Sequence, residues 1–412
     1  MDLMNYTPLG DKKNSDFFHE YLPRIYQRRA GSGIDELVRE MAGVVVQVDH
    51  GDAVAYLAEL ATMGPYRLTG SRLTDTHRVF VLTSQPEFPR LVVLEPLSPT
   101  YSDEITRWNR MYPLSRTKPN ARYIGEVYKA SSCADVRAAL EPQNVRFVYD
   151  GDQENSFFCR EHMTFTFLSD FTYNRVGYVD VDLDDLDALG LAERFTLAPD
   201  DLATIDAAAA VQAEHGLEGL ILGLDHMATR ILADEREDAI LEYLTMVPYY
   251  LWGAYNIVEM NSSTNVTRNP NVPDDKMSPA RVFTANNTPS FVNSFEGLPM
   301  PTEDFVRNFG RRMHHMAYEV TDGTIAGKKN VDFVVGELRD LGTDFLAHVV
   351  GECKDEPNLK QIFSKASVYS LLITEYVERC HGYEGFFTRS NVAALTEAAG
   401  EAERYEHGHV FD

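Results

Sequence analysis

The sequence of 412 residues has few cysteines and no long apolar run. Its four cysteines, at positions 133, 159, 353 and 380, are scattered and form no CxxC pair. This argues against a cysteine-based zinc or iron–sulfur site and indicates a reducing compartment. No run of about 18 apolar residues occurs, so we expect no membrane-spanning segment. The polar stretch 1–13 lacks the pattern of a signal peptide, so we expect a cytoplasmic protein.

Positive charge is also scarce. Lys and Arg number 38 against 63 Asp and Glu, which gives a net charge of −25 and a pI of about 4.8. Such a balance repels nucleic acid and anionic lipid, so we expect neither as a partner. A small anionic substrate would then need a local positive centre, which a bound metal ion can supply.

A His-Met-Ala tripeptide occurs twice, at His226 and at His315, each time inside a short apolar run. Glu375 interrupts a third such run. Two imidazoles and one carboxylate on separate strands can bind one face of a divalent iron ion and leave the other face open to substrate and dioxygen. The alternative is that these are ordinary hydrogen-bonded strand residues. The repeat at matching positions favours the metal, so we predict an Fe(2+) site made by His226, His315 and Glu375.

A β-α-β-β-β rhythm repeats along the chain and predicts an α+β fold of paired βαβββ modules. The first half has predicted strands at 44–48, 66–68, 78–82, 91–95, 123–129, 164–168 and 175–181, and helices at 52–62 and 134–140. The second half has predicted strands at 220–228, 249–260, 280–285, 290–295, 312–320 and 368–377, and helices at 235–243 and 331–341. The Asn- and Pro-rich stretch 265–275 is predicted to be a loop.

The length favours two domains. We predict an N-terminal domain at 1–185, an acidic and partly helical connection at 186–217, and a C-terminal domain with an open barrel at 218–412. The first strand of the N-terminal half has Val46 and Val48 where a ligand would lie, so that half is predicted to be a structural or oligomerising module without metal. We accordingly expect a homo-oligomer, either a dimer or a tetramer.

Four segments of the C-terminal half resemble the 4-hydroxyphenylpyruvate dioxygenase family of the vicinal-oxygen-chelate superfamily. They are residues 223–226 (Gly-Leu-Asp-His), 314–317 (His-His-Met-Ala), 359–365 (Leu-Lys-Gln-Ile-Phe-Ser-Lys) and 373–379 (Ile-Thr-Glu-Tyr-Val-Glu-Arg). The resemblance covers roughly the last 195 residues and is only architectural before them. It implies that His226, His315 and Glu375 bind iron. It also implies that a 2-oxo acid substrate and O2 are the partners, with no separate 2-oxoglutarate.

The resemblance further implies the roles of pocket residues. Ser278, Asn293 and Gln361 match polar residues that act in catalysis, and Phe363 matches an aromatic that stacks on the substrate ring. Each has an alternative role, because Ser278 precedes Pro279 and can be a turn residue, Asn293 can cap a strand, and Phe363 can be core. The other implied substrate-binding residues are His314, Phe386, Asn391 and Val392.

Two of these positions depart from the family pattern. His314 stands where a glutamine is usual, and Val392 stands where an aromatic is usual, although Phe386 or Phe387 could take its place. Loss of one stacking ring weakens the preference for an aromatic substrate by about 0.5–1.5 kcal/mol, so we expect 4-hydroxyphenylpyruvate to be a poor substrate. Strand alternation places His314 on the face opposite His315, so we expect it not to be a ligand.

Three other functions remain open from the sequence. A mandelate-forming synthase uses the same three ligands and differs in which carbon is hydroxylated. An extradiol dioxygenase also uses two histidines and a glutamate on this fold, but it usually needs a further pocket histidine, for which His314 is the candidate. A non-catalytic binding protein is the third possibility.

Overall fold

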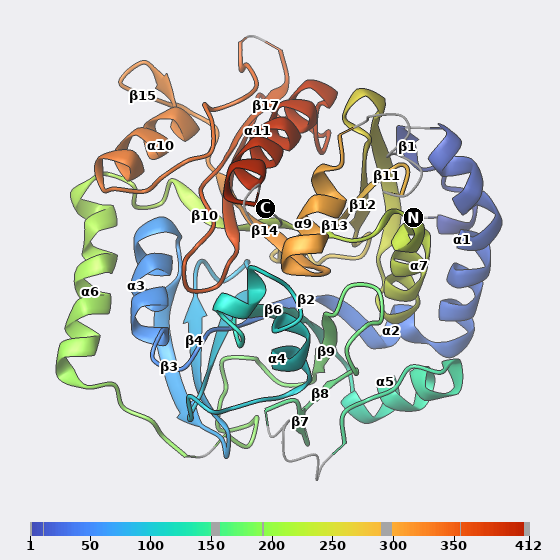
Figure 1. Cartoon of the computed structure of the whole chain (residues 1–412). Coiled ribbons are helices and arrows are strands. Elements are labelled where there is room, and N and C mark those ends of the chain that lie inside the picture. The colour runs from blue at the N-terminus through green and yellow to red at the C-terminus, as the bar shows by residue number, and fades with distance from the viewer. Residues whose placement is uncertain are drawn as a thin grey trace.

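The computed structural model describes residues 2–10, 12–149, 157–191, 193–289, 299–354 and 356–407. Two eight-stranded mixed sheets, one from each half of the chain, lie together with helices packed around them (Figure 1). Each half repeats the order strand, helix, strands that the sequence predicts, so the predicted α+β fold of paired βαβββ modules is confirmed.

The N-terminal sheet is built around two long antiparallel strands, β2 (Val38–Gln47) and β6 (Arg122–Ala130). Apolar residues follow one another in these strands because both faces of the sheet are covered. The other strands are β3 (Arg67–Leu73), β4 (His77–Thr83), β5 (Arg90–Pro96), β7 (Cys159–Arg160), β8 (Met163–Phe165) and β9 (Arg175–Val179), and the order across the sheet is β3-β4-β5-β2-β6-β9-β8-β7.

The C-terminal sheet has the equivalent central pair, β10 (Ile221–Arg230) and β14 (Arg312–Val320). Its other strands are β1 (Leu9–Gly10), β11 (Tyr250–Ile257), β12 (Ser262–Arg268), β13 (Ala280–Asn286), β17 (Asn358–Phe363) and β18 (Ile373–Cys380), in the order β1-β11-β12-β13-β10-β14-β18-β17. The predicted loop at 265–275 is wrong over its first four residues, which belong to β12. Burial of alternating Ser, Thr and Asn side chains outweighs the loop-like composition there.

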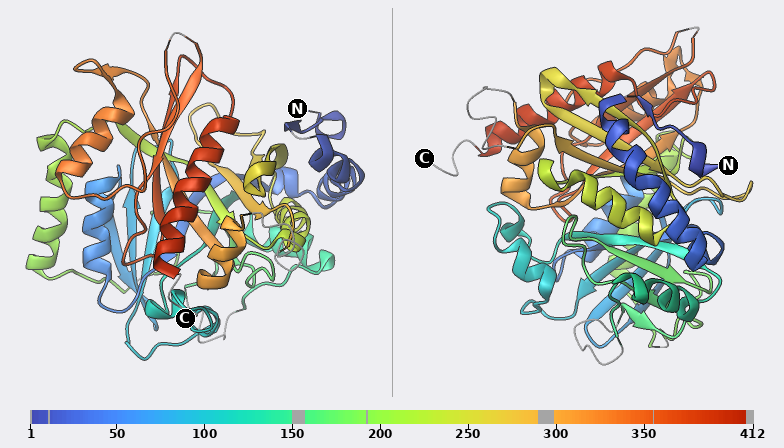
Figure 2. Two further views of the ribbon diagram at one scale, coloured as in Figure 1. Left: turned by 45° about the horizontal axis from the view of Figure 1, so that its top comes forward. Right: turned by 90° about the vertical axis from the view of Figure 1, so that its right-hand side faces the viewer.

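Helices cover the outer faces and close the front of the C-terminal sheet. α11 (Arg389–His407) and α9 (Pro301–Phe309) lie side by side in front of that sheet, whereas α3 (Ala53–Met63) packs on α6 (Pro199–Glu214) (Figures 1 and 2). The other α-helices and short elements are α1 (Lys12–Ser32), α2 (Ile34–Leu37), α4 (Glu104–Asn109), α5 (Cys133–Leu140), α7 (Arg236–Met246), α10 (Asn330–Asp340), β15 (Thr324–Ile325) and β16 (Lys328–Lys329).

The N-terminal segment of the chain packs on the C-terminal half, and the predicted domain boundaries stay a prediction. The N-terminal strand β1 pairs with β11 of the C-terminal sheet. Arg29 of α1 donates to the carbonyls of Leu244 (3.1 Å) and Val247 (2.7 Å), which ties α1 to α7. Within the predicted connection, Leu186, Leu189 and Leu191 are buried in the core of the N-terminal sheet. The predicted connection is acidic in composition, but its leucine side chains pack on the first half of the chain.

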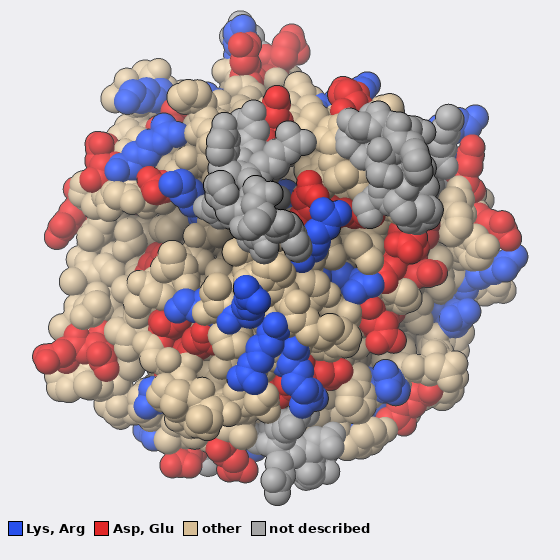
Figure 3. All heavy atoms as spheres, viewed as in Figure 1, with Lys and Arg blue, Asp and Glu red and all other residues tan. Residues whose placement is uncertain are grey.

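A disulfide joins Cys353 to Cys380 at the end of β18, with the Cα atoms 5.8 Å apart. This bond does not fit the inference of a reducing compartment, which rested on the scattered spacing of the cysteines. Cys133 and Cys159 are free. Of the helices that the structure describes, none is long and apolar enough to cross a membrane. On the face shown in Figure 3, basic side chains gather below the centre, over α4, despite the net negative charge.

Candidate functional site

Three adjacent strands bring His226, His315 and Glu375 together. His226 on β10 pairs with Ala317 of β14, and Ala317 pairs in turn with Glu375 of β18. His315 lies two residues before Ala317 on the same face of β14. All three side chains therefore project from one face of the sheet, with His315 two residues along the strand from the level of His226 and Glu375.

The ligand atoms of these three residues converge in the protein interior. Glu375 Oε2 lies 3.0 Å from His226 Nε2 and 3.2 Å from His315 Nε2. His226 is fully buried, Glu375 is 1% exposed and His315 is 8% exposed. Although close together, His226 Nε2, His315 Nε2 and both Glu375 carboxylate oxygens make no hydrogen bond within the described residues.

These residues fit a divalent iron ion. Buried polar atoms are normally hydrogen-bonded, so four such atoms aimed at one another without hydrogen bonds indicate a missing partner. The three ligand atoms lie within 4.8 Å of one another, close enough to bind a single ion. Two imidazoles and a carboxylate are also the donor set of the facial triad that binds ferrous iron.

Asp225 and Arg379 hold the His226 ring in place. Asp225 Oδ2 accepts a hydrogen bond from His226 Nδ1 (2.7 Å) and lies 3.0 Å from Arg379 Nη2. This leaves Nε2 of His226 as the free ligand atom. Burial lowers the pKa of His226, but Glu375 and Asp225 outweigh it and raise that pKa to about 9. The electric field at this point therefore favours a positive charge.

The prediction that His314 faces away from His315 is wrong. Ala228 of β10 pairs with His315, but the next residue, Thr229, pairs with Met313. His314 is thus the extra residue of a β-bulge, which interrupts the alternation of side chains. Its Nδ1 lies 2.8 Å from His315 Nδ1, so one ring donates to the other and His314 orients His315 through the nitrogen that faces away from Glu375.

A small cavity of about 50 Å³ lies beside the three residues, between the sheet and α11. Of the residues predicted from the sequence, His314, Gln361, Phe363 and Val392 line it together with His315 and Glu375. Phe363 lies against His315, with ring centroids 4.7 Å apart. The side-chain oxygen of Gln361 is buried and has no hydrogen-bond partner among the described residues. It is therefore positioned to accept a hydrogen bond from a bound molecule.

The structure does not bring the other predicted pocket residues to this cavity. Ser278 Oγ accepts a hydrogen bond from Met41 N (3.1 Å) and contacts Tyr249 Oη (2.8 Å), which places it between the two halves. Asn391 donates to the carbonyl of Leu359 (3.1 Å) and ties α11 to β17. Phe386 packs behind His226, whereas its neighbour Phe387 lines the cavity. Asn293 lies outside the described residues.

Sequence reasoning missed polar residues that do line the cavity. Thr264 of β12 and Thr284 of β13 are cross-strand partners, and Arg230 ends β10. Arg230 donates to Pro301 O (3.3 Å) and lies over the ring of Phe305. The period-2 pattern of β13 could have revealed Thr284, because it lies two residues after Val282 on the same face. Thr264 lay between the predicted strand 249–260 and the predicted loop 265–275, and was assigned to neither.

The N-terminal sheet has glycines at the positions equivalent to the three ligands. Gly43 pairs with Val127 and Val127 with Gly177, just as His226 pairs with Ala317 and Ala317 with Glu375. Gly125 pairs with Val45, just as His315 pairs with Ala228. A Cβ atom on Gly177 would lie 2.5 Å from the ring of Phe165. The space of a metal site is therefore occupied by apolar side chains. The equivalent of His226 is Gly43, not Val46 or Val48 as predicted.

Comparisons with known proteins support the fold. No family model and no curated protein matches the sequence. A mutant of 4-hydroxymandelate synthase from Streptomyces coelicolor has a similar structure, with a TM-score of 0.58 and 18% identity over 89% of this chain and 99% of that one. A fusion of a xylose isomerase-like TIM barrel with 4-hydroxyphenylpyruvate dioxygenase has a TM-score of 0.56 and 12% identity over 89% of this chain and 53% of that one. The chain thus has the vicinal-oxygen-chelate fold.

Proposed function

We propose that this chain is an Fe(2+)-dependent dioxygenase that oxidatively decarboxylates a 2-oxo acid and hydroxylates the same molecule. The single observation that carries the proposal is the convergence of His226, His315 and Glu375, whose buried ligand atoms have no hydrogen-bond partners among the described residues. The shared fold with 4-hydroxymandelate synthase and the 4-hydroxyphenylpyruvate dioxygenase fusion supports it.

Each part of the site has a task in this reaction. His226, His315 and Glu375 would hold the ion. When bound, ferrous iron supplies Lewis acidity toward the 2-oxo acid and the redox capacity to use dioxygen. Asp225 and His314 keep the two imidazoles in the orientation that presents Nε2. Phe363 and Phe387 exclude water, and Gln361 orients the organic part of the substrate through its side-chain amide.

The substrate that fits best is compact. A cavity of about 50 Å³ is far below the roughly 300–1,000 Å³ of sites that hold drug-sized molecules. Val392, Leu395 and Thr396 of α11 line this cavity and limit its size. An aliphatic 2-oxo acid is therefore favoured over 4-hydroxyphenylpyruvate, in agreement with the departures at His314 and Val392.

The test is oxygen uptake and CO2 release by the iron-loaded protein with a panel of aliphatic and aromatic 2-oxo acids. We expect one CO2 per O2 with no added 2-oxoglutarate, and no turnover by Glu375→Gln. Mass spectrometry of the product then shows which carbon is hydroxylated, which separates this chemistry from mandelate formation. Formation of succinate in step with product, and only when 2-oxoglutarate is added, would refute the proposal.

A second candidate is extradiol ring cleavage, which His314 favours because it lies in the pocket and contacts a ligand histidine. The small cavity argues against it, since a catechol ring needs more room. Adding catechols to the same panel of substrates distinguishes ring cleavage from oxidation of a 2-oxo acid. Oxygen uptake with a catechol and without CO2 release would favour ring cleavage.

A further inference from the structure

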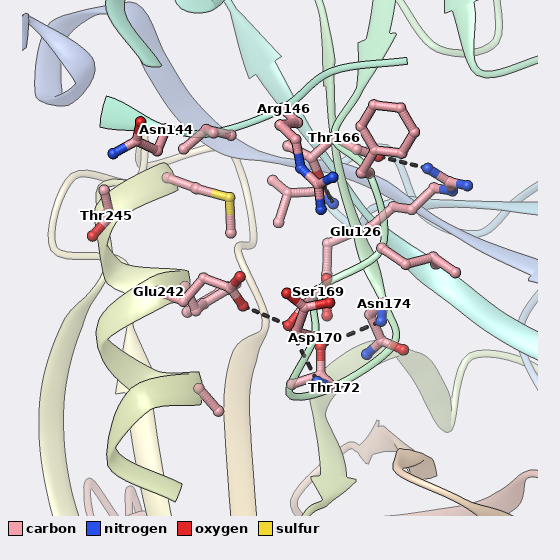
Figure 4. Close-up of a pocket in the computed structure, with 18 of the residues that line it drawn as sticks. Glu126, Asn144, Arg146, Thr166, Ser169, Asp170, Thr172, Asn174, Glu242 and Thr245 are labelled. Atoms are coloured by element: carbon pink, nitrogen blue, oxygen red, sulfur yellow. Dashed lines mark hydrogen bonds between the residues drawn. The ribbon is translucent and has the colours of Figure 1, made fainter. Parts of the chain in front are cut away.

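A second and larger cavity, of about 320 Å³, lies between the two halves of the molecule (Figure 4). One wall is formed by β6, β9 and the chain before β9, and the other by α7 and β13. It shares no lining residue with the cavity beside Glu375. It is therefore a separate space, and the dioxygenase chemistry proposed above does not use it.

One end of this cavity is acidic. Glu242 of α7 and Asp170 lie there, and Ser169 Oγ donates to Glu242 Oε2 (2.5 Å), which fixes the carboxylate (Figure 4). Desolvation raises the pKa of Glu242, and the nearby Asp170 and Asp238 raise it further. Within the described residues, no Lys or Arg forms an ion pair with Glu242 or Asp170. Negative charge gathers at this end without a cation to balance it.

The opposite end is basic. Arg146 lines this side, across the cavity from Ser169 and Asp170, and Arg28 of α1 is a further lining residue; both arginine side chains are exposed (Figure 4). The guanidinium group of Arg146 stacks over the ring of Phe167, 5.2 Å from its centroid, which limits its movement. Neither Arg28 nor Arg146 has an acidic partner in the part of the chain that the structure describes. This end therefore presents unneutralised positive charge.

The middle of the cavity is polar and contains a buried ion pair. Arg281 Nε and Glu126 Oε1 form an ion pair of 2.5 Å, and both side chains are only 2% exposed. Asn174 is buried, and its side-chain oxygen has no hydrogen-bond partner among the described residues. Arg175 is a further buried lining residue and donates to the carbonyl of Thr166 (2.8 Å). The middle therefore offers hydrogen-bonding groups between the two ends.

We propose that this cavity binds a small zwitterion, an amino acid whose ammonium group lies at Glu242 and Asp170 and whose carboxylate lies at Arg28 and Arg146. The acidic and basic groups line different sides of one cavity. This arrangement suits an amino acid whose two charges lie at opposite ends of a short carbon chain. A dicarboxylate would meet repulsion at the acidic end, and a diamine at the basic end.

Four-carbon probes of matched length test this assignment by calorimetry on the full chain: γ-aminobutyrate, succinate and putrescine. We expect γ-aminobutyrate to bind and to raise Tm at about 10 mM, whereas succinate and putrescine bind at least about tenfold more weakly. Arg146→Gln and Glu242→Gln should each weaken γ-aminobutyrate binding at least about tenfold. Arg194→Gln, an exposed arginine away from the cavity, is the control.

Two outcomes would overturn the assignment: binding of succinate or putrescine as tight as that of γ-aminobutyrate, or no heat with any of the three probes. If Glu242→Gln does not fold, Arg146→Gln still tests the assignment, because Arg146 is exposed and its replacement leaves the core unchanged. Because no probe is a 2-oxo acid and the readout is binding, the result is independent of the proposed dioxygenase activity.

Discussion

At the scale of single residues, the candidate metal site depends on the hydrogen bonds that orient its two histidine ligands. Each histidine uses one ring nitrogen toward Glu375 and the other toward a neighbour, which is Asp225 for His226 and His314 for His315. Asp225 is itself held by Arg379. Burial raises the pKa of Asp225, but Arg379 and His226 outweigh it and hold that pKa well below its usual range. The lowered pKa therefore favours the charged carboxylate, which accepts the hydrogen bond from His226.

Asp225→Asn tests this support. The amide cannot accept from His226 Nδ1 with the strength of a carboxylate, so the ring loses its fixed orientation. We expect affinity for Fe(2+) to fall roughly 10–100-fold, measured by anaerobic titration, with the fold retained by circular dichroism. Asp187→Asn is the control, because that carboxylate pairs with Arg72 at the surface. Unchanged iron affinity in Asp225→Asn would show that Asp225 does not position the ligand.

His77 of β4 predicts a pH dependence of stability. Burial lowers the pKa of His77 to about 4, although Asp103 partly offsets the effect. The unfolded chain binds this proton near pH 6.5 and the folded chain only near pH 4. Its contribution is therefore complete above about pH 6.5 and is lost as pH falls to about 4, by an amount on the order of 3 kcal/mol.

Denaturant unfolding of the protein and of His77→Gln between pH 4 and 7 measures this effect. Glutamine keeps a hydrogen-bonding group near Gln47 but does not titrate. We expect the variant to lose less stability on acidification than the unmodified chain. Identical pH profiles for the two proteins would contradict the assignment to His77.

At the scale of elements, the sequence predicted strands well where apolar residues alternate or run together. The predicted strand at 312–320 coincides with β14, and the predicted helix at 134–140 differs from α5 by one residue. The prediction from the sequence was wrong where composition and structure disagree, as in β12, whose Ser and Thr residues are typical of a loop. The bulge at His314 could not be predicted, because it depends on the pairing of β14 with β10 rather than on local pattern.

The residues of the candidate site could likewise be predicted only in part. His226 and His315 could be predicted because a His-Met-Ala motif repeats, and Glu375 because it interrupts an apolar run in a segment that resembles a known family. Thr264 and Arg230 were not, because their place in the cavity follows from the register of three strands. Asn391 has the expected residue type but turns toward Leu359, which only the placement of α11 decides.

Val392 of α11 predicts how the cavity selects its substrate. Val392→Ala removes two methyl groups from the wall beside Phe387 and enlarges the cavity. We expect kcat/KM for phenylpyruvates to rise roughly tenfold relative to that for short aliphatic 2-oxo acids. Val258→Ala is the control, because Val258 is 64% exposed. No change in the ratio of the two kcat/KM values would show that α11 does not set the size of the substrate.

At the scale of the whole molecule, two copies of one sheet architecture have different residues at equivalent central positions. The C-terminal copy has His226, His315 and Glu375 at three positions where the N-terminal copy has Gly43, Gly125 and Gly177. Glycine there leaves room for Phe165 and Leu183, so the first half buries an apolar core where the second has a polar centre. The predicted dimer or tetramer, and the predicted domain boundaries, stay predictions.

The most direct test of this account is the iron content of the protein and of three single variants after anaerobic loading with Fe(2+) and desalting. We expect about one iron per chain in the unmodified protein and a small fraction of that in His226→Ala, His315→Ala and Glu375→Ala. His162→Ala is the control, because His162 also precedes a methionine but lies in the N-terminal half beside Asp180. Full iron content in His226→Ala, with the fold intact, would contradict the central claim.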